Sequence, residues 1–139
     1  MQPPINHTQT SWNHYLWWQI VGCLLIALVV TLSLVSYSPA ISVEGGDKYE
    51  HTLAYATLMY WWGMLQPGRR WLWALALPLI GVSMEWLQNL MPNRQMDWRD
   101  ALANTLGVAL ALIVLATPLG RLLAWVDHKL PNRINPGRS

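Results

Sequence analysis

The sequence predicts an all-α fold, a polytopic membrane four-helix bundle that forms one domain over residues 1–139. Of its residues, 53% are hydrophobic and only 12% are charged, about half the charged share of a typical soluble domain. The apolar residues gather in four long segments that are joined by polar connections. The apolar content excludes a disordered chain. A net charge of +2 without a basic run gives no indication of nucleic-acid binding.

Each apolar segment is predicted to be a helix, because an open strand leaves its backbone unsatisfied in lipid. The predicted spans cover residues 16–37, 49–65, 71–88 and 101–125. The first is long enough for a hydrocarbon core of about 30 Å, and the second is short for a span. Pro78 predicts a kink in the third span. Residues 126–139 are expected to form a mobile cytoplasmic tail.

Basic residues are distributed unevenly between the two ends of the predicted bundle. With four spans, both termini and the turn at 66–70 share one side, and the two acidic loops share the other. The terminal side carries six basic residues, which are Arg69, Arg70, Arg121, Lys129, Arg133 and Arg138. The other side carries three, which are Lys48, Arg94 and Arg99. Because basic loops remain inside the cell, we expect a multi-pass protein with both termini in the cytoplasm.

A first polar cluster lies at the start of the second span. Asp47, His51 and Tyr55 fall at positions i, i+4 and i+8 of one helical stripe, and Lys48 borders it. Asp47 is either a helix N-cap or part of a site. His51 is either a neutral interfacial histidine or a functional residue. The side chains of Lys48, His51 and Tyr55 are expected to point into the bundle together.

A second polar cluster follows the third span. Glu85 and Gln88 lie at i and i+3 near its end, and Arg94 stands in the loop that follows. If the fourth helix begins early, one stripe carries three polar residues, which are Asp97, Asp100 and Asn104. Asn104 lies inside the span, where an amide bonds either another helix or a ligand. Gly107 is expected to allow close helix packing.

No metal ion and no cofactor are expected from these residues. Four of them carry atoms that bind divalent ions, namely His51, Glu85, Asp97 and Asp100. However, Lys48 and Arg94 would occupy the same space, and the His-Glu-x-x-His and Asp-x-Asp patterns do not occur. No serine lies in a Gly-x-Ser-x-Gly context. The clusters therefore favour a polar cup at one rim of the bundle over a metal centre or a nucleophilic triad.

These motifs resemble those of the VanZ-like family. Residues 47–55 are similar to its Asp-Lys-x-x-His-x-x-x-Tyr signature. The second signature is matched by Glu85-Trp86-Leu87-Gln88 with Arg94, Asp97, Asp100, Asn104 and Gly107. The resemblance covers about residues 15–125 and implies a small integral protein of the bacterial inner membrane. The founding member of the family is associated with resistance to the glycopeptide teicoplanin, through less antibiotic binding at the cell surface.

Three functions remain open from the sequence. In the first, an outward-facing cup binds or modulates an anionic envelope lipid, a peptidoglycan precursor or a glycopeptide interaction, with Lys48 and Arg94 gripping the anion. In the second, a membrane enzyme acts on a lipid-linked phosphate or peptide, with His51 as general acid or base and Glu85 or Asp97 as its partner. In the third, the polar residues only pack the helices. The expected surroundings are membrane lipids, and no oligomeric state is predicted.

Overall fold

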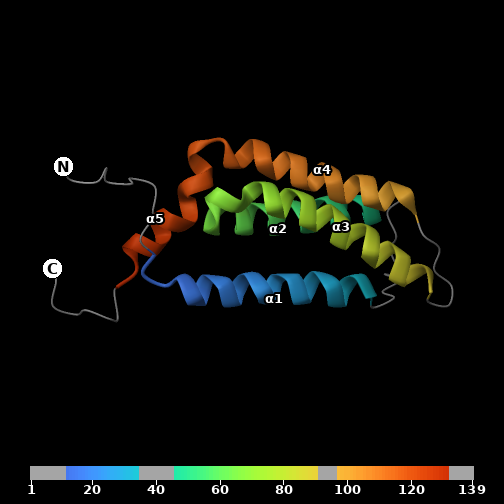
Figure 1. The fold of residues 1–139 in the computed structure, drawn as a ribbon, viewed down its shortest axis with the longest axis horizontal. Coiled ribbons are helices and arrows are strands. Elements are labelled where there is room, and N and C mark those ends of the chain that lie inside the picture. The colour runs from blue at the N-terminus through green and yellow to red at the C-terminus, as the bar shows by residue number, and fades with distance from the viewer. Residues whose placement is uncertain (1–11, 35–45, 91–96, 132–139) are drawn as a thin grey trace, which may run out of the picture.

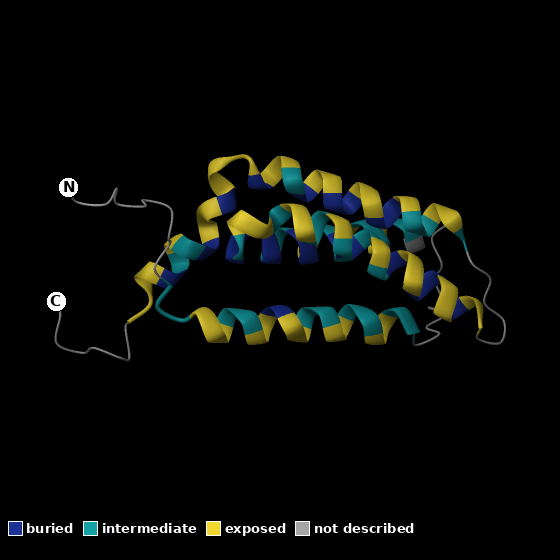
Figure 2. Cartoon of the chain, in the orientation of Figure 1, coloured by how far each residue is buried: buried dark blue, intermediate teal, exposed yellow. Residues whose placement is uncertain are grey.

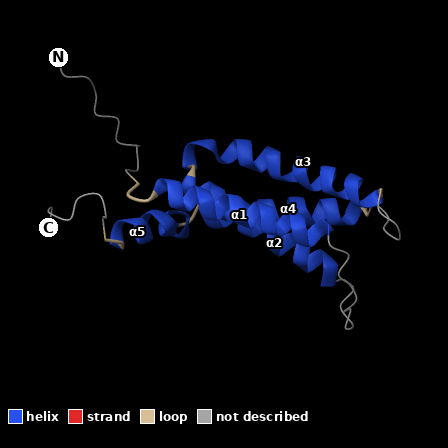
Figure 3. Ribbon diagram, turned by 90° about the horizontal axis from the view of Figure 1, so that it is seen from below, coloured by secondary structure: helices blue, strands red, loops and turns tan. Residues whose placement is uncertain are grey.

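The computed structural model describes residues 12–34, 46–90 and 97–131, and every regular element in this part of the chain is a helix (Figure 3). The elements are α1 (Tyr15–Leu34), α2 (Gly46–Leu65), α3 (Arg70–Asn89), α4 (Trp98–Leu115) and α5 (Leu122–Lys129). Short 3-10 turns at Pro67–Arg69 and Pro118–Arg121 precede α3 and α5. The all-α prediction is therefore confirmed.

The first four helices lie lengthwise beside one another, and successive helices run in opposite directions (Figure 1). Helices α2 and α4 consequently run parallel, and both begin where α1 and α3 end. We call this the loop end of the bundle. At the opposite end, which we call the terminal end, α1 begins and α5 follows α4 (Figure 1). The antiparallel order expected from the sequence is thus present in the described helices.

Only two of the four predicted spans, α1 and α4, are both long and apolar enough to cross a membrane by length and composition. Helix α2 begins at Gly46 and has 20 residues, so the second segment is longer than predicted. Helix α3 also has 20 residues and continues through Pro78. Both have sufficient length, about 30 Å, but they carry more polar residues. The predicted residues 35–37 lie outside the described part.

The fourth predicted segment, 101–125, is wrong as a single helix. Helix α4 begins early, at Trp98, and ends at Leu115. Pro118 then opens a 3-10 turn, because proline has no N–H for a continuing helix. The chain resumes as α5, which reaches Lys129, so residues 126–129 belong to a helix and not to a mobile tail. The remainder of that tail, 132–139, lies outside the described residues.

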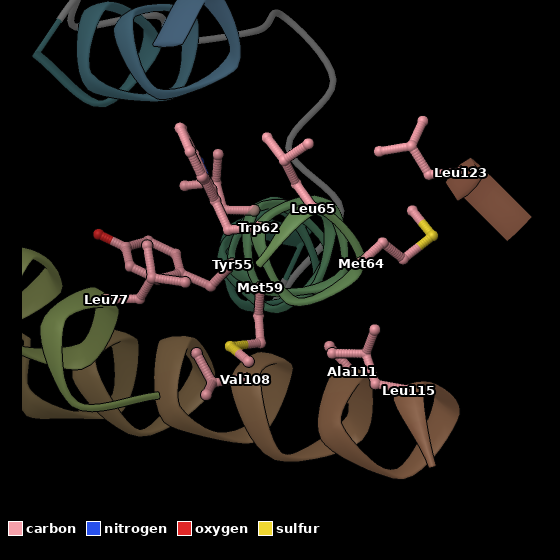
Figure 4. Packing of buried hydrophobic residues seen from close by; sticks show 11 residues of the cluster. Tyr55, Met59, Trp62, Met64, Leu65, Leu77, Val108, Ala111, Leu115 and Leu123 are labelled. Carbon is pink, nitrogen blue, oxygen red and sulfur yellow. The ribbon is translucent and has the colours of Figure 1, made fainter. Parts of the chain in front are cut away.

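Helix α2 is the centre of the hydrophobic core. Figure 4 looks along α2 and shows its side chains pointing outward in several directions towards α3, α4 and α5. Met59 is completely buried and points towards Val108 of α4. Met64 points towards Leu123 of α5. Helix α2 thus packs against these three helices, whereas α1 has one buried residue, Gly22.

The tightest helix contact joins α2 to α4. A Cβ atom on Gly107 would lie 2.2 Å from the backbone oxygen of Thr52 and 2.9 Å from the backbone nitrogen of Ala56. Thr52 Oγ1 also donates a hydrogen bond of 3.2 Å to the carbonyl of Ala103. Small residues let two helix backbones approach this closely. The expected packing role of Gly107 is confirmed, and this contact fixes the offset between α2 and α4.

Candidate functional site

Three helices bring charged side chains together at the loop end. Helix α2 supplies Lys48 and His51, α3 supplies Glu85, and α4 supplies Asp97 and Asp100. We call these five residues the rim cluster. The offset fixed at Gly107 places the first turns of α2 and α4 side by side, and the end of α3 lies against them.

Lys48 and two aspartates form the outer part of the rim cluster. Lys48 Nζ donates to Asp97 Oδ2 at 3.1 Å and to Asp100 Oδ1 at 3.0 Å. Asp97 is also the N-cap of α4, because its Oδ1 accepts a hydrogen bond from the backbone N–H of Arg99 at 2.9 Å. That backbone hydrogen bond, followed by the one from Lys48, holds the pKa of Asp97 below its usual range. Asp97 is therefore an anion that orients both the helix start and the lysine.

The inner part of the rim cluster is a triad of His51, Glu85 and Asp100. One ligand-type atom from each residue lies within 4.8 Å of the others. His51 Nε2 is 3.6 Å from Asp100 Oδ2. The backbone N–H of Asp97 donates to Glu85 Oε2 at 3.4 Å. The side chains of His51 and Asp100 are 15% and 14% exposed, and Glu85 is 2% exposed, so the triad lies at the boundary between solvent and the bundle interior.

A second polar layer lies one helical turn deeper than the triad. Tyr55, Gly81 and Asn104 are each four residues from a triad member on the same helix, which is about 6 Å along the axis. A Cβ atom on Gly81 would meet Asn104 Nδ2 at 2.6 Å and Tyr55 Oη at 3.2 Å. Glycine at position 81 therefore leaves room for these two polar groups. The Asn104 side-chain oxygen is buried and has no hydrogen-bond partner among the described residues.

The rim cluster carries more negative than positive charge. It holds three carboxylates and one lysine, which gives a net charge of −2 when His51 is neutral. Both α2 and α4 begin here, and the positive ends of their dipoles stabilise nearby anions by about 0.3–1 kcal/mol each. The helix dipoles help to explain how acids can gather at the loop end.

Most of the residues expected in the site meet there, and some do not. Tyr55 and Asn104 form the deeper layer, and Lys48, His51, Glu85, Asp97 and Asp100 form the rim cluster. Gln88 is buried, but its Nε2 donates to the Ser33 carbonyl of α1 at 2.7 Å. It therefore joins two helices outside the triad. Arg94 and the side chain of Asp47 lie outside the described residues.

The sequence analysis missed a second polar cluster, at the terminal end. Asp127 of α5 is fully buried and accepts hydrogen bonds from the backbone N–H groups of Asn13 and His14. The only hint in the sequence is an acid directly after the apolar run that ends at Trp125-Val126. Its role depends on residues more than 100 positions earlier, which no local pattern reveals.

Fold and site together define the described part of the chain as a small all-helical protein with an apolar exterior and a polar cluster at each end. No family model matches the chain. It is similar to an uncharacterized protein of Schizosaccharomyces pombe, C11E3.10, with 28% identity over 110 residues, which is 75% of this chain and 67% of that protein. No solved structure matches the chain. The function is therefore argued from the site.

Proposed function

We propose that this chain is an integral membrane protein that binds the polar head group of a lipid-linked cell-envelope ligand at the rim cluster. One observation carries the proposal: charged residues from three helices converge at one end of a bundle whose outer surface is apolar. The resemblance of the two signatures to the VanZ-like family supports the same proposal, because most signature residues of the described part lie in or next to the rim cluster.

The apolar exterior supports a location in the membrane. Figure 2 shows exposed residues along the outward faces of α1 and α4. On α1, the exposed fractions of Leu16, Leu24 and Leu32 are 67%, 63% and 63%. Large apolar residues are exposed on α3 and α4 as well, with Leu79 at 67% and Ile113 at 66%. Contiguous apolar surface of this extent is unusual for a protein in water. We propose that α2 and α3, which have the same length as α1, span the membrane with α1 and α4.

The charge of the rim cluster restricts how a head group is held. The sequence suggested that Lys48 grips an anion, but two aspartates already hold its ammonium group. Carboxylates accept hydrogen bonds from the hydroxyl groups of a sugar or from an amine. The proposed ligand therefore presents hydroxyl or amine donors to Glu85 and Asp100.

A membrane enzyme is the second candidate, and one distance favours it. His51 Nε2 and Asp100 Oδ2 are 3.6 Å apart, and pairs of catalytic groups often shorten when substrate binds. A carboxylate beside histidine stabilises the imidazolium that forms when histidine removes a proton. In this candidate function His51 is a general base that acts on a lipid-linked phosphate or peptide, and buried Glu85 is the general acid.

Binding of defined lipids to the purified protein tests both functions. We expect native mass spectra in detergent to show adducts with a polyprenyl phosphate carrying a disaccharide, and weaker adducts with phosphatidylcholine. His51→Ala and Asp100→Asn should each reduce the bound fraction at least about 5-fold, which corresponds to about 1 kcal/mol. The matched control is Arg69→Ala, which changes an exposed cation at the terminal end and should leave binding unchanged.

The outcomes separate the three functions that the sequence left open. Binding that depends on His51 and Asp100 without a change in ligand mass supports the binding module. A product whose formation requires His51 supports the enzyme. If the wild-type protein does not bind, or if the site variants lower only its melting temperature and folded yield, the residues serve packing and the proposal is wrong.

A further inference from the structure

We propose that His51, Glu85 and Asp100 form the binding site of one divalent metal ion of the first transition row. These residues come from three different helices, so the site is assembled by tertiary packing. The metal site itself does not require a lipid ligand. Its further role, in which the bound cation contacts a head-group phosphate, rests on the proposed function.

The geometry of the donor atoms is the first argument. One nitrogen and two carboxylate oxygens lie within 4.8 Å of one another. Metal–ligand bonds of about 2.0–2.2 Å place donor atoms at most about 4.4 Å apart across the ion. Side-chain movements of less than about 1 Å therefore bring all three donors to bonding distance. Three protein ligands and one position for water or substrate is the usual composition of a catalytic or ligand-exchanging zinc site.

The hydrogen bonds around the triad are the second argument. Asp100 uses Oδ1 to accept from Lys48, while its Oδ2 lies beside His51. Glu85 accepts from the backbone N–H of Asp97. Partners of this kind orient the ligands of metal sites and keep the coordinating atoms in place. The sequence-based expectation that Lys48 would occupy the metal position does not hold, because Lys48 bonds the other oxygen of Asp100. Arg94, for which the same was expected, lies outside the described residues.

The third argument comes from the layer below the triad. Asn104 is 1% exposed, and its side-chain oxygen has no hydrogen-bond partner among the described residues. A buried acceptor left unpaired costs about 1–3 kcal/mol. Asn104 lies one turn below Asp100 on the same face of α4, between the three helices that supply the triad. A water molecule bound to the metal would donate to this oxygen and remove that cost.

Charge is the fourth argument. The rim cluster has a net charge of −2 with neutral His51, and Glu85 is almost completely buried. A divalent cation at the triad would balance the net negative charge of these five residues. One imidazole with two carboxylates suits Zn²⁺ or Mn²⁺ better than Ca²⁺, which prefers six to eight oxygen ligands. The metal would also turn an acidic cluster into one that can accept a phosphate.

Metal titration of the purified full-length protein tests the site without any lipid. After treatment with EDTA and removal of the chelator, Zn²⁺ or Mn²⁺ alone is titrated and bound metal is counted by elemental analysis. We expect about one ion per chain. His51→Ala and Asp100→Asn should each weaken metal binding more than about 100-fold. This exceeds the 10–100-fold loss that follows when a residue that only hydrogen-bonds a metal ligand is changed. Zn²⁺ should raise the melting temperature of the wild-type protein only while the triad is intact.

Glu50→Gln is the matched control. Glu50 is an exposed acid of α2 near the same end of the bundle, and it lies outside the rim cluster. We expect Glu50→Gln to bind metal and to gain thermal stability from Zn²⁺ as the wild type does. His128→Ala controls for binding at an exposed histidine of the terminal end. Circular dichroism and gel filtration establish that each variant is folded.

Two results would overturn the metal site. One is wild-type protein that binds no Zn²⁺ or Mn²⁺, and the other is Asp100→Asn protein that is folded and binds metal as tightly as the wild type. Repeating the lipid measurement with EDTA separates this proposal from the previous one. Metal binding without lipid binding would leave the site standing and reject the proposed ligand. If the protein binds no metal and EDTA does not change its lipid binding, the proposed lipid ligand stands and the metal site is rejected.

Discussion

The indole Nε1 of Trp18, in the first helix, donates a hydrogen bond of 2.7 Å to Oδ1 of Asp127, in the last helix. The same carboxylate accepts from the backbone N–H groups of Asn13 at 2.6 Å and His14 at 3.0 Å. Backbone N–H groups just before and at the start of a helix have no partner within the helix. Asp127 therefore caps α1 from more than 100 residues away along the chain, and it attaches this largely exposed helix to the rest of the bundle.

Replacing Asp127 should detach the start of α1. Asp127→Ala leaves three partly buried donors without this acceptor, and the expected loss in the free energy of unfolding is about 2–3 kcal/mol. We expect a clear fall in the melting temperature measured in detergent and faster proteolysis near α1. His128→Ala, at the exposed neighbouring position, should have little effect. Equal stability of the two variants would contradict the capping role.

The stability of the protein should fall in acid because of the same carboxylate. Burial raises the pKa of Asp127, but the hydrogen bonds from Asn13, Trp18 and His14 outweigh this and lower its pKa below the usual range. Its contribution to stability is therefore complete above the unfolded-state pKa of about 3.9, and it is lost as the pH falls through that value towards the folded pKa. Helix α5 lies outside the proposed spans, so the carboxylate titrates at an aqueous end.

Melting temperatures measured between pH 3 and pH 7 test this dependence. The wild-type protein should lose stability below about pH 4. Asp127→Asn cannot titrate at this position, so its melting temperature should be lower at neutral pH and should decline less in acid. Parallel curves for the two proteins would show that other groups cause the acid sensitivity.

Adding a methyl group at Gly107 should separate α2 from α4. The new Cβ in Gly107→Ala would lie 2.2 Å from a backbone oxygen of Thr52, and backbone atoms cannot rotate away as a side chain does. We expect a loss of about 1–3 kcal/mol in the free energy of unfolding, together with weaker Zn²⁺ binding at the triad. Gly68→Ala is the control, because its Cβ would meet nothing within 4 Å. An unchanged melting temperature for Gly107→Ala would show that the helices are not held this closely.

Labelling with an impermeant maleimide should reveal the orientation in the membrane. In a Cys23→Ala background, Tyr49→Cys marks the loop end and Gly68→Cys marks the terminal end. Tyr49 is 77% exposed, and both positions are open to solvent. With the terminal end in the cytoplasm, intact bacterial cells should label only Tyr49→Cys, and permeabilised cells should label both. Labelling of Gly68→Cys alone in intact cells would reverse the orientation.

The rim cluster could be predicted in part because helical periodicity is a local property. His51 and Tyr55 lie four residues apart, as do Asp100 and Asn104, and each pair shares a face of its helix. The sequence could not give the two aspartate partners of Lys48. They depend on how far α4 is shifted along α2, which the contact at Gly107 decides. Gln88 lies three residues after Glu85, so the sequence places both near one face of α3. In the structure the side chain of Gln88 instead points towards α1, where it donates to the Ser33 carbonyl.

The amino-acid sequence by itself determined the helical class, the order of the apolar segments and the polar residues that each helix can present. These follow from composition and from a repeat of 3.6 residues, which act over one or two turns. Only the tertiary structure decided that His51, Glu85 and Asp100 meet, that the last segment bends at Pro118, and that Asp127 caps α1. Each of these depends on the distance and offset between helices, which are set where side chains of distant segments pack together.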